Sequence, residues 1–125
     1  MNIDELEAGR ELDALVAEKV MKCKTATKEW NGVLHPFCCC DGSDHEQRCT
    51  YVPGMLAYYS TDIAAAWEVV EKLFTLNAFV EIGNDAFQWT VMVIPRSRRD
   101  CNYGYGETVH LAICRAALKA VGDLG

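Results

Sequence analysis

Apolar residues recur at helical spacing in three segments of this chain. Residues 3–21 carry them three or four positions apart, and acidic residues fill the first turn, where the helix dipole favours negative charge. Residues 60–76 begin at Ser60 and residues 108–121 at Thr108, and both side chains are good N-caps. The expected core stripe of the middle helix is Ile63, Trp67, Val70, Leu73 and Phe74.

Two other segments alternate as strands do. Residues 78–82 and 87–94 are rich in β-branched and aromatic residues and flank a short Gly-Asn-Asp connection, so they predict a hairpin. A lone hairpin is marginally stable, so we expect a sheet of at least three strands. KEWNGVLH and RCTYVPGM each have the composition of a further short strand. The pattern predicts an α+β domain with three helices packed on a small antiparallel sheet.

Length and charge narrow the class of protein. A chain of 125 residues fits one domain, residues 1–125, and a net charge of −6 argues against broad nucleic-acid binding, which needs Lys and Arg to neutralise phosphates. We see no apolar run of about 20 residues for a membrane span and no signal peptide at the start, so we expect a cytoplasmic protein. Its seven cysteines, an odd number, are then reduced, buried or metal-bound.

Four of those cysteines and two of the three histidines lie in HPFCCCDGSDHEQRC, residues 35–49. We expect this Cys/His-rich segment to be an insertion outside the central sheet. Cysteine and histidine at close spacing suit the tetrahedral coordination of zinc. The set that we predict for a structural zinc ion is Cys38, Cys40, His45 and Cys49, with His35 and Cys39 as alternative ligands. The alternative is a reduced loop whose thiols cluster without metal, and a catalytic thiol is a smaller third option.

A second candidate site is IPRSRRDCNYGYGET, residues 94–108, which we expect to be a loop. Guanidinium groups bind phosphate, tyrosines stack on bases, and a helix N-terminus favours anions. The predicted pocket for a phosphate-bearing molecule is Arg96, Arg98, Arg99, Asn102, Tyr103, Tyr105 and Thr108. The alternative is a solvated connector whose arginines pair with surface acids.

The sequence contains none of the common nucleotide-binding or hydrolase motifs, so it favours a protein without catalytic activity but leaves an enzyme open. Cys114 falls in an apolar stripe, where we expect an inert thiol, and the tryptophans Trp30, Trp67 and Trp89 are expected core anchors.

Three blocks, MNIDELEAGRELDALVAEKVM, YSTDIAAAWEVVEKL and LAICRAALKAV, resemble the phage ABA sandwich domain family. The resemblance implies an α-β-α layered domain encoded by a bacteriophage or prophage and working in the bacterial host, and it brings no catalytic residues. In that setting the anion pocket suggests a counter-defence protein that sequesters a small nucleotide-derived host signal. The alternative is a module that inhibits a host defence protein through the Cys/His segment. A homo-oligomer stays open under both.

Overall fold

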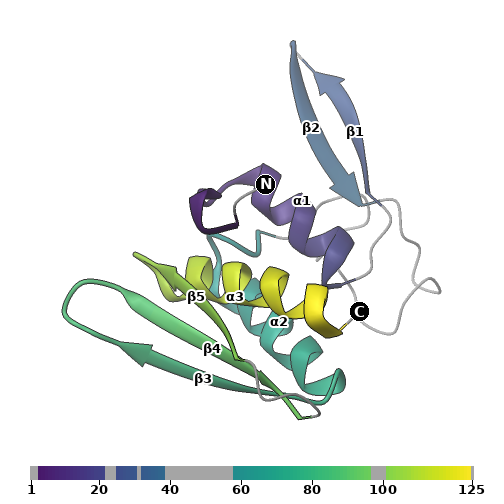
Figure 1. Ribbon diagram of the computed structural model, residues 1–125. Coiled ribbons are helices and arrows are strands. Elements are labelled where there is room, and N and C mark those ends of the chain that lie inside the picture. Colours follow the sequence, from purple (N-terminus) through teal and green to yellow (C-terminus); the bar gives the residue numbers. More distant parts are fainter. Residues whose placement is uncertain (1–2, 22–24, 31, 39–57, 97–100, 125) are drawn as a thin grey trace.

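The computed structural model describes residues 3–21, 25–30, 32–38, 58–96 and 101–124, with the backbone alone described for 25–30, 33–38 and 122–124 (Figure 1). A 3-10 turn, η1, covers Ile3–Glu5 and precedes helix α1, Arg10–Lys19. The other helices are α2, Ile63–Thr75, and α3, Val109–Leu124. The strands are β1, Thr25–Trp30; β2, Val33–Cys38; β3, Ala78–Asn84; β4, Trp89–Pro95; and β5, Asn102–Gly106.

The central sheet is an antiparallel meander in the order β3-β4-β5. Helix α2 lies along β3, and α3 lies along β4 and β5, so the two helices cover one face (Figure 1). The α+β class, the three helices and a sheet of three strands are therefore confirmed. The layering differs from the prediction because α1 packs on α3 and not on the sheet. Within the described residues the order is sheet, α2 with α3, then α1.

Strand β5 corrects the prediction that residues 94–108 form a loop. Its tyrosines alternate with two glycines, and the glycines face α3. A Cβ on Gly104 would lie 2.2 Å from the Ala112 carbonyl oxygen and 2.4 Å from the Ala116 backbone nitrogen. The glycine and the alanines together let helix and strand backbones touch, which explains why a segment that reads as a loop pairs as a strand.

Helix α2 buries a different face from the one that we expected. Its buried side chains are Ala65, Ala66, Val69, Val70 and Leu73. Ile63, Trp67 and Phe74 are about half exposed, so placing them in the core was wrong. The two alanines share a turn with Val69 and Val70, and their small size lets the helix pack closely with that side inward.

Ser60 is not the cap of α2. The side chain of Asp62 accepts the Ala64 N–H and is the N-cap. Ser60 is fully buried and donates both its backbone N–H and its hydroxyl to Asp13 Oδ1, at 2.8 and 2.7 Å. The serine hydroxyl also accepts the Gly9 N–H, and Arg10 pairs with Asp13 Oδ2 at 2.9 Å. This buried link joins α1 to the segment that precedes α2. The chain bends at residues 8–9, so the predicted single helix over 3–21 is divided into η1 and α1.

The antiparallel hairpin β1-β2 forms a second sheet, separate from the first and standing away from it (Figure 1). KEWNGVLH supplies its turn at Gly32, where φ is +78°. Residues 35–38 of the predicted insertion belong to β2. Residues 39–49 of that insertion and the predicted strand RCTYVPGM lie outside the described residues.

Candidate functional site

The face of the β3-β4-β5 sheet that turns away from α2 and α3, here called the outer face, carries part of the predicted anion pocket. Tyr103 and Tyr105 lie there opposite Met92 and Thr90, with their rings 6.3 Å apart and nearly parallel. At the end of β4, the Arg96 guanidinium lies over the Phe79 ring at 4.9 Å, a cation–π contact. The structure therefore brings Arg96 and the two tyrosines to one side of the sheet.

Two other residues of the predicted pocket lie elsewhere. Asn102 points to the opposite face because side chains alternate along a strand, and its amide nitrogen is buried without a hydrogen-bond partner among the described residues. Thr108 caps α3 by accepting the Leu111 N–H at 3.3 Å. Arg98 and Arg99 lie outside the described residues. The outer face is an open sheet surface, whereas small ligands bind in concave sites.

The structure describes little of the predicted zinc site. Cys40, His45 and Cys49 lie outside the described residues, and Cys38 is described only as the last backbone position of β2. The described part of the chain holds no group of three or more metal-ligating side chains. Zinc at this segment stays a prediction.

Cys114 lies on α3 and is fully buried, as expected. Burial raises the pKa of its thiol, and the nearby charge of Asp13 raises it further. A thiol held protonated in this way is a poor nucleophile, which agrees with an inert core cysteine.

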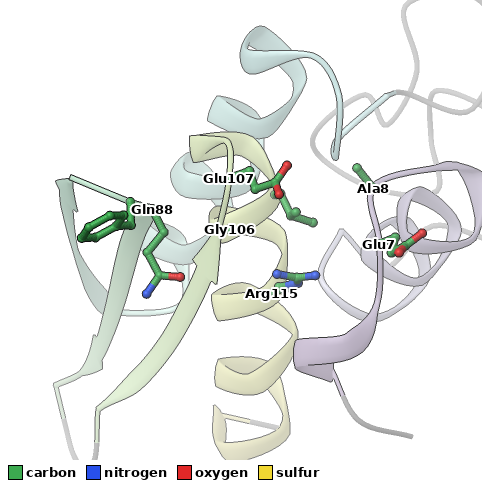
Figure 2. A pocket seen from close by; sticks show the side chains of 8 residues that line it. Glu7, Ala8, Gln88, Gly106, Glu107 and Arg115 are labelled. Carbon is green, nitrogen blue, oxygen red and sulfur yellow. The ribbon is translucent and has the colours of Figure 1, made fainter. Parts of the chain in front are cut away.

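A cleft of about 510 Å³ lies between the N-terminal segment, the β3-β4 connection and the junction of β5 with α3 (Figure 2). Asp85 shapes one wall, because its carboxylate accepts the N–H groups of Phe87 and Gln88 at 2.8 Å each and fixes the turn. These two hydrogen bonds also lower the pKa of Asp85. The eight lining residues are Glu7, Ala8, Phe87, Gln88, Gly106, Glu107, Leu111 and Arg115.

Arg115 is the distinctive residue of this cleft. Its Nε and Nη2 donate to the Leu6 carbonyl at 3.0 and 2.6 Å, and Nη1 donates to the Tyr105 carbonyl at 2.7 Å. All three acceptors are backbone oxygens, and no described carboxylate forms an ion pair with this guanidinium. A guanidinium has five N–H donors, so two remain for a ligand. Figure 2 shows the group reaching from α3 toward the chain at Glu7 and Ala8.

Sequence reasoning missed Arg115. The available signal was a pair of charges four positions apart, Arg115 and Lys119, inside the otherwise apolar run LAICRAALKAV. A charge at that position of a buried helix needs a partner. The spacing alone did not reveal that the partners would be the carbonyls of Leu6, 109 positions away, and of Tyr105.

The rim of the cleft has the opposite charge. Glu7 and Glu107 line it and are both exposed. With Arg115 the lining carries one positive and two negative side chains, and Leu111 and Phe87 add apolar surface. This arrangement favours a ligand with one anionic group and disfavours a polyphosphate, whose further charges would meet the rim carboxylates.

The family model for the phage ABA sandwich domain matches residues 14–118. The chain belongs to the phage ABA sandwich domain family. Among solved structures, a phage protein from Bacillus cereus ATCC 14579 has the same fold, with a TM-score of 0.61 at 21% identity, over 91% of this chain and 92% of that one. No curated protein gives a significant match. The resemblance and the phage origin that the sequence predicted are thus confirmed. Among the described helices, none has the length and apolar character that crossing a membrane requires.

Proposed function

We propose that this phage ABA sandwich protein binds and sequesters a small nucleotide-derived ligand in the Arg115 cleft, with a single phosphodiester on the guanidinium. The observation that carries the proposal is a half-buried arginine whose charge has no carboxylate partner among the described residues and whose hydrogen bonds leave two donors over. Charge-assisted hydrogen bonds in a shielded site contribute about 1.5–3 kcal/mol each.

The remaining lining suits the other parts of such a ligand. Gln88 offers a donor and an acceptor for the edge of a base, and Leu111 and Phe87 offer apolar contacts. A cleft of about 510 Å³ lies within the range of small-molecule sites. The described lining holds no pairing of nucleophile and base, so binding without catalysis is the simpler role.

The test is calorimetric titration with a cyclic mononucleotide, a cyclic dinucleotide and ADP-ribose. We expect the cyclic mononucleotide, with one negative charge, to bind more tightly than the cyclic dinucleotide and ADP-ribose, which carry two each. Arg115→Lys should weaken binding about tenfold or more, since it loses the fork of donors. Because Arg115 also joins backbone segments, thermal unfolding of the variant must show that it is folded.

A second variant avoids that complication. Glu107→Gln removes a rim charge from an exposed side chain, so the anionic ligand should bind a few-fold more tightly. Glu71→Gln changes another exposed carboxylate, on α2 and away from the cleft lining, so it is the matched control and should leave affinity unchanged. No binding across the panel, or equal responses from both variants, contradicts the proposal.

The outer face of the sheet offers an alternative binding site. If ligand binding is lost in Tyr103→Ala and kept in Glu107→Gln without a gain, the ligand lies on the tyrosine pair, where the sequence analysis placed it. If the panel fails and a host protein binds instead, inhibition of a defence factor is the better description. The observation in favour of that second role is the outer face, where Tyr103 and Tyr105 are exposed.

A further inference from the structure

Five large apolar side chains that the core leaves exposed belong to only two neighbouring elements. On α2 and β3, the side chains of Ile63, Trp67, Phe74, Phe79 and Ile82 are between 39% and 51% exposed. Helix α2 runs along β3. Side chains alternate along a strand, so Ile82 points to the side of α2 and Phe79 to the outer face, and the five side chains flank the free edge of β3 from both faces of the sheet. Aromatic side chains cover about 150–250 Å² each, so the patch presents on the order of 400 Å² of apolar surface. Patches of this size on a monomer are often functional.

The patch adjoins an open sheet edge. Strand β3 pairs with β4 on one side, and no described strand pairs with its other side. On α2 the exposed apolar residues recur at i, i+4 and i+11, which places them on one side of the helix. Helix α2 contacts α3 and β3, and the side with Ile63, Trp67 and Phe74 is one that neither covers.

We infer that a second copy of this chain docks along β3 and α2 by a two-fold axis, so that the two sheets join through antiparallel β3 strands and the two α2 helices pack side by side. Such an isologous contact places the same patch on both copies. Apolar atoms make up a little over half of a typical interface, so about 400 Å² of apolar area implies a buried area of roughly 700 Å² per partner. That is close to the roughly 800 Å² per partner of a standard-size interface.

The charges on β3 favour a two-fold centre at Val80 over one at Glu81. A two-fold centred on Glu81 would place two like charges opposite each other, which destabilises a strand pair. A centre on Val80 instead sets Phe79 opposite Glu81 of the second copy. Arg96 lies over Phe79, so its guanidinium then meets that carboxylate. Neither Arg96 nor Glu81 has an ion-pair partner among the described residues, and both side chains are exposed.

The experiment is sedimentation velocity over about 1–100 μM, where a dimer has twice the 13.9 kDa of the chain. We expect the wild type to dimerise, and Glu81→Arg or Arg96→Glu alone to weaken dimerisation about tenfold or more. The double variant Glu81→Arg with Arg96→Glu restores the attraction and should recover the dimer. Wild-type monomer throughout the range, or single variants that dimerise as well as the wild type, overturns the inference.

A second pair of variants tests the apolar part of the interface. Trp67→Ser should shift the protein toward monomer, whereas Phe87→Ser, at a side chain that is 92% exposed but outside the patch, should not. An equal effect of both changes would mean that general surface hydrophobicity, and not this patch, drives association. That result also overturns the inference.

Discussion

The two edges of the central sheet are closed in different ways. At β5, two side chains of α3 cover the edge: Arg115 donates to the Tyr105 carbonyl, and Lys119 donates to the Tyr103 carbonyl at 2.7 Å and pairs with Asp4 at 2.7 Å. The η1 segment lies against α3 as well, and its Asp4 is the residue that pairs with Lys119 (Figure 1). At β3 the described residues provide no such cover, and apolar side chains line the edge. Exposed edges invite pairing, and cationic side chains block it, so this sheet can add a strand at β3 and not at β5.

The largest difference in stability between the two edges should come from adding a methyl group to one glycine of each edge strand, Gly104 on β5 and Gly83 on β3. Gly104→Ala places a Cβ against the backbone of α3, and overpacking of this kind costs about 3 kcal/mol or more because backbone cannot yield as a side chain does. Gly83→Ala on β3 meets nothing within 4 Å and should be neutral or slightly stabilising. Urea unfolding of both variants measures the difference. Similar stabilities would show that α3 does not press on β5.

Removing Arg115 should have the next largest effect. Arg115→Gln loses charge-assisted hydrogen bonds to Leu6 and Tyr105, which we expect to cost about 2 kcal/mol. Arg96→Gln, on the β3 side, should change the stability of the monomer by less than about 0.5 kcal/mol, since it is exposed. Denaturant midpoints at low protein concentration report both. Equal losses would contradict the asymmetry of the two edges.

Lys119→Ala should cost about 1 kcal/mol, because its ammonium bonds are partly exposed. Its sharper readout is hydrogen exchange. The backbone amides of β5 should exchange faster in the variant, whereas the amides of β3 should keep their wild-type rates. Faster exchange in β3 as well would indicate global destabilisation in place of an opened edge.

The smallest effect concerns Glu68 on α2. Burial raises the pKa of Glu68, and the charges of Glu71 and Asp62 raise it further. A raised pKa means that the folded state binds this proton more tightly, so ionised Glu68 is a cost at neutral pH that disappears as the pH falls below the ordinary glutamate pKa. Glu68→Gln should stabilise by at most a few tenths of a kcal/mol at pH 7, after allowing for solvent screening, and by nothing in acid.

Thermal unfolding of Glu68→Gln across pH 3–7 measures this difference, with Glu81→Gln as the exposed control on β3. Glu81→Gln should show no comparable gain at neutral pH. A gain for Glu68→Gln that persists in acid would point to packing of the amide and not to the carboxylate charge.

The spacing of apolar residues predicted where α2, α3 and the β3-β4 hairpin lie, and capping by Thr108 predicted the start of α3, because those signals are local. They did not predict which side of α2 faces the core. Ala65 and Ala66 are buried there in place of Trp67, because their small side chains allow close helix packing. They missed β5 because glycines that suit a turn also suit contact with a helix, and only the position of Ala112 and Ala116 decides between the two. The same limit hid the cleft, whose arginine finds its partners 109 and 10 positions away.

The buried bond between Asp13 and Ser60 has a consequence for how related chains can diverge. It fixes two points 47 positions apart in the sequence at hydrogen-bond distance, with a separate hairpin on the chain between them. The entropy of closing a loop grows only with the logarithm of its length, so doubling that span would cost about 0.6 kcal/mol. Once the ends are fastened, evolution can lengthen, shorten or replace the intervening sequence while the helices and the central sheet keep their places.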